Sequence, residues 1–411
     1  MSKKRNTILY LSYDGMTDPL GQSQVIPYLK GLAQSGYRIH LISFEKSERY
    51  NKGKDPIELI LKASGIQWYP LNYTSKPPVI STITDVNRME ARASKLIRSE
   101  EIVLVHCRSY ISALVGLKMK RKFGIKFLFD MRGFWADERV DGNIWKLKNL
   151  IFKTIYAYFK RKEIQFLNQA DAIVSLTHNA ANEIKNWKHF KGVSIDVIPC
   201  CADLNLFQTK STALNHKLQI KVQLGIAESA FVLSYLGSLG TWYMLDEMLD
   251  FFKVLREYKP NAVFLFITAD KPEEIYSSAS IKEIDSSAIV VKSASRNEVP
   301  AFASVSDLSV FFIRPSFSKK ASSPTKMGEL MAGGIPLVVN AGVGDVEEIM
   351  QDGGNGRVIM EFTEAEYHRV CRELDSILAE DPERTIQCAQ KWYSLEQGTN
   401  HYNLIYKRLL G

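Results

Sequence analysis

Short apolar runs alternate along the chain with longer segments in which apolar residues recur every three or four positions. The short runs are typical of buried strands, and the longer segments are typical of helices with one apolar face. Elements that alternate in this way form parallel sheets covered by helices. The strands expected in the first half are 8–12, 39–42, 102–105, 126–129, 172–175 and 195–198. Those expected in the second half are 231–236, 262–267, 288–291, 308–312 and 336–339.

The length of the chain and one polar segment predict how these elements divide into domains. A chain of 411 residues is long enough for two domains of roughly 200 residues each. Residues 204–228 are polar and weakly periodic, which is typical of a boundary. We therefore predict one Rossmann-like domain over 1–203, a second over 204–384, and a C-terminal segment over 385–411 that packs back on the first domain.

The C-terminal residues 382–410 have the pattern of two helices separated at Gly398. In Rossmann-like domains, ligands bind at the carboxyl ends of the strands. We therefore expect the two domains to face one cleft.

Composition and charge narrow the range of partners. Hydrophobic residues make up 45% of the chain and charged residues 24%, which is the balance of a globular protein. The net charge of +8 favours an anionic partner, which is a nucleotide, a nucleic acid or an acidic membrane surface. No RNA-binding module is recognisable, so we expect no nucleic-acid partner. The sequence has no membrane span and no signal peptide, and we expect a cytoplasmic protein.

Cysteines and histidines give no metal signature. The five cysteines form no CxxC pair, so neither a disulfide framework nor a zinc site is indicated. The seven histidines lack the spacing of metal ligands, and no Asp-x-Asp motif follows a strand. We expect a protein that needs no metal.

The most informative segment begins at Ser323. Ser323 suits a helix N-cap and Pro324 the first helical position, so a helix with free backbone N–H groups should start here. Such an end attracts phosphate, and a ligand anion would explain Lys326, which otherwise opposes the helix dipole. Glu329 lies further along, where its carboxylate can accept two hydroxyl hydrogen bonds from a ribose or a sugar. The alternative is an ordinary capped helix with solvated Lys and Glu side chains.

This segment carries a resemblance to a known family. Residues 323–340, together with 341–345, resemble the donor-binding segment of the group 1 (family 4) glycosyltransferases, in the subgroup whose motif is SPxKxxE. Residues 197–204 resemble the interdomain stretch of that family, and 235–240 resemble the first strand and loop of its C-terminal domain. The resemblance spans nearly the whole chain and implies the GT-B fold, which is an α/β fold of two Rossmann-like domains.

The resemblance also implies an activity of the hexosyltransferase type. A sugar would pass from a nucleotide diphosphate sugar to a saccharide or lipid-linked acceptor with retention of configuration, in cell-surface polysaccharide, lipopolysaccharide or glycoconjugate biosynthesis. The nucleotide sugar is a substrate, and no cofactor is expected. In the family, a Glu at the position of Glu329 binds the donor ribose. The residues expected to bind the donor are Gly21, Gln22, Gly237, Ser238, Thr241, Ser323, Thr325, Lys326 and Glu329.

A glycine loop follows the first predicted strand. Gly15 and Gly21 permit tight turns and a close backbone approach to a diphosphate or a sugar. An ordinary strand-to-helix turn is the alternative. The resemblance places this loop against the donor phosphates and the acceptor, so we expect Asp14 and Gly15 to bind the acceptor and Gly21 and Gln22 the donor.

Residues 130–139 begin at the carboxyl end of a predicted strand and are rich in charged and aromatic side chains. Trp135 can stack on a pyranose in the acceptor, and Arg132 can bind an anion through two hydrogen bonds. We take Arg132, Asp137 and Glu138 as the candidate catalytic residues. A salt-bridged surface loop is the alternative. Many relatives have a His at the end of this strand, and this chain has none there.

Two further departures from the family concern the donor side. Ala321 stands where the family places a first Glu, eight residues before Glu329. Residues 240–243 replace the usual Arg and Lys pair after the first strand of the second domain, and Lys326 would supply the missing charge. These departures leave open a non-catalytic partner subunit that binds a nucleotide sugar. A nucleotide-sugar epimerase of GT-B fold, which shares the fold and the donor site, is the other alternative.

Residues 145–162 contain six basic residues and no acidic one, together with several aromatic residues. As a helix, this segment can lie on an anionic membrane that holds a lipid-linked acceptor. The alternative is a domain helix whose Lys stems cover apolar neighbours. We therefore expect a cytoplasmic protein with peripheral contact to the inner face of the cytoplasmic membrane.

Overall fold

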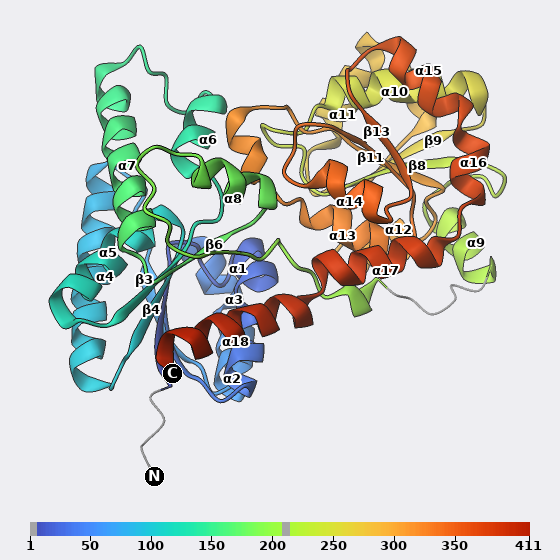
Figure 1. The fold of residues 1–411 in the computed structure, drawn as a ribbon. Helices are drawn as coiled ribbons and strands as arrows, with labels where there is room; N and C mark the ends of the chain where they lie inside the picture. The colour runs from blue at the N-terminus through green and yellow to red at the C-terminus, as the bar shows by residue number, and fades with distance from the viewer. Residues whose placement is uncertain (1–5, 208–213) are drawn as a thin grey trace. The chain divides into compact units, whose positions relative to one another are not determined.

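The computed structural model describes residues 6–207 and 214–411, and the chain divides into two compact units (Figure 1). The first unit comprises Met1–Cys200 and Leu395–Gly411, and the second comprises Cys201–Ser394. Part of the predicted boundary segment, 208–213, lies outside the described residues.

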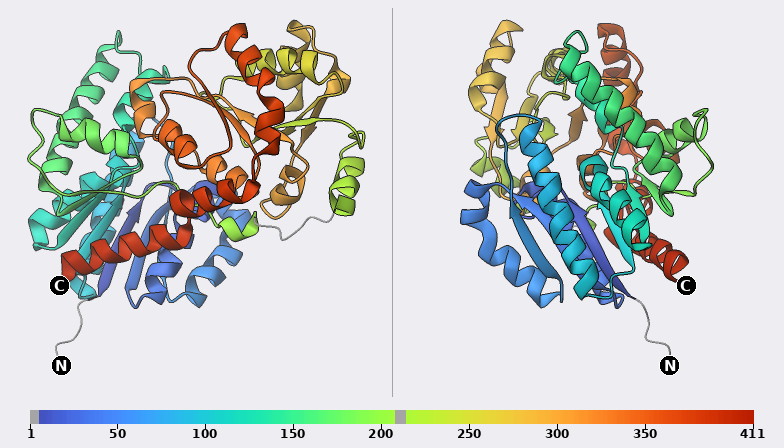
Figure 2. Two further views of the ribbon diagram at one scale, coloured as in Figure 1. Left: turned by 45° about the vertical axis from the view of Figure 1, so that its right-hand side comes forward. Right: turned by 90° about the vertical axis from the view of Figure 1, so that its left-hand side faces the viewer.

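The first unit is built on a parallel sheet of seven strands among its described residues, in the order β3-β2-β1-β4-β5-β6-β7 (Figure 2). The strands are β1 (Thr7–Ser12), β2 (Arg38–Glu45), β3 (Gln67–Asn72), β4 (Leu104–Arg108), β5 (Lys126–Asp130), β6 (Ala172–Ser175) and β7 (Ile195–Val197). The helices are α1 (Pro19–Gln24), α2 (Ile26–Gln34), α3 (Ser47–Ala63), α4 (Ile80–Ser99), α5 (Ser109–Phe123), α6 (Trp135–Asp141), α7 (Leu150–Gln169), α8 (His178–Lys185) and α18 (Leu395–Leu410).

The second unit repeats this design with a parallel sheet in the order β10-β9-β8-β11-β12-β13. The strands are β8 (Val232–Leu236), β9 (Val263–Ile267), β10 (Ile289–Lys292), β11 (Leu308–Phe311), β12 (Leu337–Asn340) and β13 (Gly356–Ile359). The α-helices are α9 (Leu214–Gln223), α10 (Leu245–Tyr258), α11 (Pro272–Ile281), α12 (Val299–Ala303), α13 (Thr325–Ala332), α14 (Val346–Asp352), α15 (Glu364–Arg372), α16 (Leu374–Ala379) and α17 (Pro382–Tyr393). The short 3-10 turns are η1 (Leu204–Leu206), η2 (Ser286–Ala288) and η3 (Phe317–Ala321).

The predicted α/β class with two parallel sheets is confirmed. Every predicted strand is present, but the periodicity missed β3 and β13. Both strands lie at the edge of a sheet, so their side chains need not be uniformly apolar. β3 even contains Pro70, which a strand tolerates at an edge because it cannot donate a ladder hydrogen bond.

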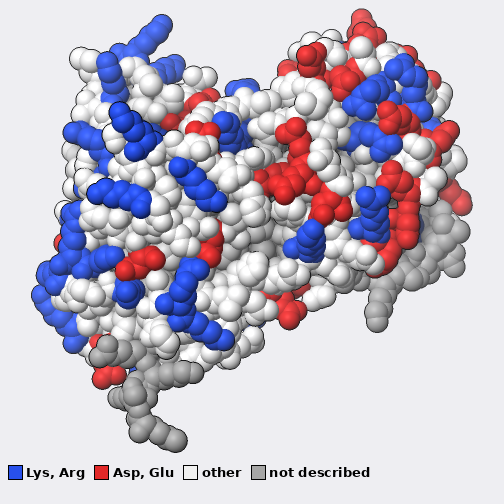
Figure 3. Space-filling model, viewed as in Figure 1, with Lys and Arg blue, Asp and Glu red and all other residues white. Residues whose placement is uncertain are grey.

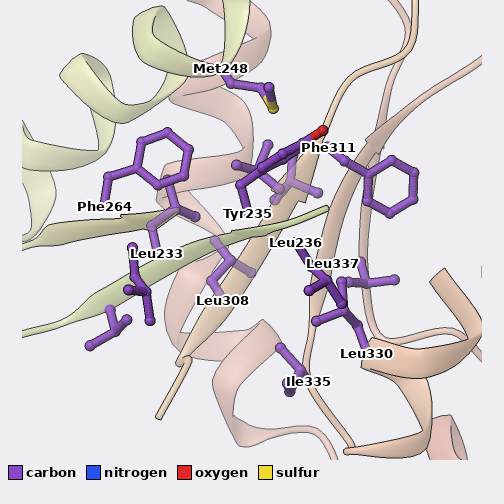
Figure 4. Close-up of a cluster of buried hydrophobic side chains, with 14 of the residues drawn as sticks. Leu233, Tyr235, Leu236, Met248, Phe264, Leu308, Phe311, Leu330, Ile335 and Leu337 are labelled. Carbon is purple, nitrogen blue, oxygen red and sulfur yellow. The ribbon is translucent and has the colours of Figure 1, made fainter. Parts of the chain in front are cut away.

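The core of each unit lies against its central strands. In the second unit, Leu233, Leu308 and Leu337 come from neighbouring strands and are inaccessible to solvent (Figure 4). Leu330 of α13 packs into the same core and is 1% exposed. This packing anchors α13 to the sheet and fixes where its first turn lies.

The two C-terminal helices are separated at a different residue from the one predicted. The two helices separate at Ser394, and Gly398 lies inside α18. Ser394 is extended, with φ −62° and ψ 122°, and it pairs with Ala202 in an isolated bridge. This pairing ends α17, which belongs to the second unit, while α18 belongs to the first unit and packs on α2.

The strand orders define where ligands can bind in each unit. β1 lies between β2 and β4 in the first sheet, and β8 lies between β9 and β11 in the second, so the strand order reverses at β1 and at β8. In sheets of this kind, ligands bind at the carboxyl ends of the strands where the order reverses. Ser12 and Arg108 end β1 and β4, and Leu236 and Phe311 end β8 and β11.

Candidate functional site

The predicted phosphate-binding helix is present in the second unit as α13. Its N-cap is Pro324, with φ −74° and ψ 108°, and Thr325 is the first helical residue. The prediction of Ser323 as N-cap was therefore wrong by one residue, because Pro324 keeps an extended ψ. The helix start still lies beside Lys326, which is buried at 8% exposure.

Lys326 lies in an aromatic cage near the end of β8. Its Nζ donates a hydrogen bond of 2.9 Å to the hydroxyl of Tyr235. The same Nζ lies 4.0 Å from the ring centroid of Tyr235 and 3.6 Å from that of Tyr243. These contacts favour a cation electrostatically, because the ring faces are negative.

Lys326 forms no ion pair with a carboxylate within the described residues. Burial holds the pKa of its ammonium well below the ordinary value, while the charges of Glu329 and Asp270 act in the opposite direction. A buried ammonium without an adjacent carboxylate is costly in the free protein. The arrangement therefore suits an anionic ligand that would complete it.

Glu329 lies one turn after Lys326 and is 6% exposed. Its Oε1 accepts a hydrogen bond of 2.5 Å from Nη1 of Arg296. Burial raises the pKa of Glu329, and Arg296 and Lys326 lower it. The Arg296 side chain is 44% exposed and lies over the ring of Phe207 at 5.3 Å. Sequence analysis missed Arg296, because it lies in a loop whose own pattern carries no signal.

The loop after β8 holds the other predicted donor residues. Gly237 has φ +100°, and a Cβ at this position would lie 3.2 Å from Nζ of Lys326. Asp270 fixes the loop by accepting hydrogen bonds from the hydroxyl of Ser238 at 3.0 Å and from the amide of Leu239 at 2.5 Å. Ser238 and Thr241 are exposed. The structure thus brings Gly237, Lys326 and the start of α13 together.

In the glycine loop of the first unit, backbone amides bind a carboxylate of the protein itself. The buried carboxylate of Glu45 accepts hydrogen bonds from the amides of Met16 at 2.8 Å and Thr17 at 3.1 Å. It also accepts from the hydroxyl groups of Thr17 and Ser43, both at 2.6 Å. The amides of Met16 and Thr17 therefore do not point at an external phosphate, and sequence analysis did not identify Glu45.

Close packing explains the glycines of this loop. A Cβ on Gly21 would lie 2.1 Å from the carbonyl oxygen of Gly15, and one on Gly15 would lie 2.8 Å from Oε2 of Glu45. Gln22 is exposed, and its Nε2 donates to the carbonyl of Thr17. The roles of Gly21 and Gln22 in donor binding stay predictions.

A polar cluster lies at the carboxyl ends of β4 and β5. Nε of Arg108 donates to Oδ2 of Asp14 at 3.0 Å, and Arg108 is 3% exposed. Nη2 of Arg132 lies 3.1 Å from Sγ of Cys200. Asp130 is 1% exposed and accepts a hydrogen bond of 3.0 Å from the hydroxyl of Tyr402 on α18. Of the residues that sequence analysis selected, this cluster contains Asp14 and Arg132, and it adds Arg108 and Asp130.

Asp137 is engaged elsewhere in the first unit. Its two carboxylate oxygens accept from the hydroxyl of Tyr156 at 2.7 Å and from Nζ of Lys160 at 2.8 Å, both on α7. Lys160 also pairs with Glu163, so Asp137 belongs to a network between α6 and α7. Glu138 is partly exposed on α6. The structure therefore does not bring the three predicted catalytic residues together, and their roles stay predictions.

Trp135 packs within an aromatic cluster. Its ring centroid lies 5.8 Å from that of Tyr110, 5.3 Å from Trp145 and 4.8 Å from Phe159. The guanidinium of Arg139 lies over the ring at 4.8 Å. The indole thus has neighbours of its own within the unit, and its predicted stacking on a sugar stays untested.

The predicted basic helix begins later than expected. Asn149 caps α7 by accepting from the amide of Ile151 at 2.9 Å, so 145–149 precede the helix. Leu150 and Ile151 are 77% and 65% exposed. Among the described residues, no helix is long and apolar enough to span a membrane. In the same part of the chain, no cluster of His, Cys, Asp or Glu side chains could hold a metal ion.

Comparison with known families assigns both halves of the chain. A family model described as Glycosyltransferase Family 4 matches residues 23–206. A second, described as Glycosyl transferases group 1, matches residues 216–392. No curated protein matches the chain in sequence.

Solved structures share the fold across almost the whole chain. Sucrose-phosphate synthase from Thermosynechococcus elongatus is 14% identical with a TM-score of 0.70, covering 98% of this chain and 99% of that chain. HepE from Anabaena in complex with UDP-glucose is 14% identical with a TM-score of 0.67, covering 98% and 99%. WaaG, a glycosyltransferase involved in lipopolysaccharide biosynthesis, is 16% identical with a TM-score of 0.65, covering 95% and 97%. With this GT-B fold and a family match in each half, the chain is assigned to the group 1 glycosyltransferases.

Proposed function

We propose that this glycosyltransferase transfers a hexose from a nucleotide diphosphate sugar to a saccharide or lipid-linked acceptor with retention of configuration. The proposed setting is cell-surface polysaccharide, lipopolysaccharide or glycoconjugate biosynthesis. The donor is a substrate, and no cofactor or metal takes part in the proposal. HepE, a protein of the same fold, is seen in complex with UDP-glucose, which supports a nucleotide-sugar donor here.

The observation that carries the proposal is the buried ammonium of Lys326. It lies in the first turn of α13 beside Gly237, and within the described residues no carboxylate forms an ion pair with it. A helix start provides backbone N–H groups and a positive dipole end, both of which favour a phosphate. A diphosphate bound here would supply the charge that Lys326 lacks.

Glu329 gives the proposed donor its second anchor. It follows Lys326 by three positions on α13, so both side chains lie on neighbouring parts of one helix face. Arg296 already neutralises the Glu329 carboxylate and leaves its other oxygen to accept a hydroxyl hydrogen bond. Diphosphate at Lys326 and ribose at Glu329 would then fix the donor at two points.

The chemistry needs positive potential at the leaving group. Sugar transfer passes through an oxocarbenium-like state, while negative charge grows on the departing diphosphate. Hydrogen-bond donors and positive charges of the protein that are already fixed in place stabilise this charge without reorganising during the reaction. In the proposal, the ammonium of Lys326 and the N-terminal amides of α13 fill this role.

The acceptor side of the proposal includes a peripheral membrane contact. On the face shown in Figure 3, Lys and Arg side chains gather over the first unit along α4, α5 and α7. The exposed side chains of Leu150 and Ile151 begin α7, next to Lys146 and Lys148. Apolar side chains flanked by basic ones favour an anionic lipid surface, where a lipid-linked acceptor would be available.

A thermal-shift screen of nucleotide sugars tests the donor. A true donor raises the melting temperature in proportion to its occupancy. Glu329→Ala should abolish the shift and keep the fold, because Arg296 is 44% exposed and can be solvated when its partner is removed. The matched control is Glu283→Ala, since the Glu283 side chain is 86% exposed. An undiminished shift in Glu329→Ala would remove this residue from the donor site.

Product analysis separates transfer from the alternatives. With the donor found in the screen, a transferase releases free nucleoside diphosphate when an acceptor is added. An epimerase converts the donor without an acceptor, and a non-catalytic binding subunit releases nothing. Ala321, which stands where the family has a Glu, is the feature that favours the non-catalytic alternative, so this measurement decides between them.

A further inference from the structure

Three neighbouring strands of the first unit end in polar residues at the same level. Ser12, Arg108 and Asp130 occupy paired positions at the ends of β1, β4 and β5. His106 lies two residues before Arg108, so both side chains leave the sheet on the same face. This face is covered by α18, whose Tyr406 hydroxyl lies 2.8 Å from Nδ1 of His106.

Several polar atoms of this cluster have no hydrogen-bond partner. Among the described residues, Nη1 of Arg108, Nη1 of Arg132 and Oδ1 of Asp130 have no hydrogen-bond partner, although all three atoms are inaccessible to solvent. Nε2 of His106 is equally buried and lies 3.6 Å from Oδ2 of Asp130. More than nine in ten buried polar groups in proteins are paired. Three unpaired atoms in one cluster indicate that a group from outside the chain fills it.

In the described part of the chain, neither of the two guanidinium groups has an acceptor for every one of its N–H groups. Asp14 engages only Nε of Arg108, and the Asp14 side chain is 40% exposed. Oδ2 of Asp130 accepts from Tyr402 and lies 3.6 Å from Nε2 of His106. Burial raises the pKa of Asp130, but Arg132, His106 and Arg108 together hold it below the ordinary value. Both arginines therefore keep one buried N–H group that points at no acceptor of the chain.

The backbone after both strands is held in an unusual conformation. Ser109 has φ +67° and Arg132 has φ +55°, which is the left-handed region that non-glycine residues rarely adopt. Such residues persist only where the surrounding structure holds them, and they gather at ligand sites. Here they follow β4 and β5, next to the point where the strand order reverses.

We propose that Arg108 and Arg132 form an oxyanion subsite, in which their Nη1 groups bind the oxygens of a phosphate or a carboxylate. The planar guanidinium matches both groups with two directed hydrogen bonds. The unpaired Oδ1 of Asp130 then accepts from a hydroxyl group beside the anionic end of the ligand. That the ligand is the anionic end of the acceptor rests on the proposed function, whereas the binding of an oxyanion does not.

Calorimetry with inorganic phosphate tests the subsite on the full chain. Because phosphate can also bind at Lys326, all titrations use the Lys326→Met background, which leaves the first unit unchanged. Arg108→Gln and Arg132→Gln should each weaken phosphate binding about tenfold or more, since each removes a charge-assisted hydrogen bond. Arg121→Gln is the matched control, because this arginine bonds Gln169 at an exposed site and should leave the affinity unchanged.

A second variant should change the phosphate affinity in the opposite direction, and it does not remove a buried cation. Asp14→Asn keeps the acceptor oxygen for Nε of Arg108 but removes a negative charge, so phosphate should bind more tightly. This outcome remains measurable even where an arginine variant fails to fold. Equal phosphate affinity in the background protein and in the Arg108, Arg132 and Asp14 variants would show that water fills the cluster and would overturn the proposal.

Competition identifies the source of the anion. Glucose 6-phosphate, glucuronate and glucose are added in turn against bound phosphate. Displacement by glucose 6-phosphate indicates a phosphate ester, and displacement by glucuronate indicates a carboxylate. If neither glucose 6-phosphate nor glucuronate competes better than glucose, the acceptor assignment fails. Donor binding is measured separately on wild-type protein, so a failure here leaves the donor site of the second unit unaffected.

Discussion

The ammonium of Lys326 donates a hydrogen bond of 2.9 Å to the hydroxyl of Tyr235. Tyr235 is inaccessible to solvent, and its hydroxyl in turn donates to the carbonyl of Ser238 at 2.7 Å. One tyrosine of β8 thus connects the first turn of α13 with the loop that follows β8. The position of the Lys326 ammonium is therefore set by a residue of the sheet.

Lys326→Met should weaken the binding of a nucleoside diphosphate such as UDP about tenfold or more, because a charge-assisted hydrogen bond to phosphate is removed. Methionine has a similar length and packs against the two tyrosine rings. The free protein should therefore keep its stability or gain about 1 kcal/mol, since replacing a buried charge by an apolar group is often stabilising. Calorimetry and urea unfolding measure the two effects.

The control for this variant is Lys320→Met, which changes an exposed lysine of the neighbouring turn η3. It should leave UDP binding unchanged. Equal affinity in wild type and Lys326→Met would contradict the assignment of Lys326 to the diphosphate.

The stability of the free protein should depend on pH through the same lysine. Burial holds the pKa of Lys326 well below its ordinary value of 10.5. Between these two pKa values the unfolded chain binds a proton that the native state does not bind, so the free energy of unfolding rises with pH. The destabilisation that comes from burying the charged Lys326 side chain is complete below the folded-state pKa and vanishes above 10.5.

Urea unfolding between about pH 7 and about pH 10 checks this sign when wild type is compared with Lys326→Met. As the pH rises, the unfolding free energy of wild type should increase relative to that of Lys326→Met. A difference that is flat with pH would show that the tyrosine rings hold the ammonium charged and offset its burial.

Gly21→Ala should destabilise the first unit. An added Cβ would lie 2.1 Å from the carbonyl oxygen of Gly15 and 2.7 Å from Cα of Met16, so the backbone itself must move. We expect a loss of about 1–3 kcal/mol in urea unfolding. Gly53→Ala, inside α3, is the opposite case: its Cβ would meet nothing closer than 3.8 Å, and helix propensity should add about 0.5–1 kcal/mol. Similar effects of both substitutions would refute the packing argument.

Binding to anionic vesicles should depend on the start of α7. Leu150 and Ile151 are 77% and 65% exposed, and burying one such side chain in a lipid interface contributes about 1.5–3 kcal/mol. The double variant Leu150→Asp, Ile151→Asp should therefore lose most of its cosedimentation with phosphatidylglycerol vesicles. Val222→Asp in the second unit, at a site that is 78% exposed, is the matched control and should bind as wild type does. Equal binding by all three proteins would remove α7 from the membrane contact.

The candidate site was predictable where local sequence decides geometry. The Ser323–Glu329 segment predicts a helix start with a lysine in its first turn, because proline, helix propensity and spacing act within a few residues. A tight turn at Gly21 was predictable in the same way, but its close packing against the carbonyl of Gly15 was not. Arg296, Glu45 and Arg108 were not predictable, since each acts on a partner at least 28 residues away or at the end of a different strand.

The sequence by itself determined the two α/β units, because alternating apolar runs and amphipathic segments can bury their apolar faces only as helix-covered parallel sheets. It did not determine the edge strands β3 and β13, whose partial exposure weakens the apolar pattern. Only the tertiary structure decided that Glu45 fills the glycine loop, that Asp137 pairs with Lys160, and that two arginines meet at the ends of β4 and β5. The physical reason is that side-chain pairing depends on strand order and register, which place residues distant in sequence side by side.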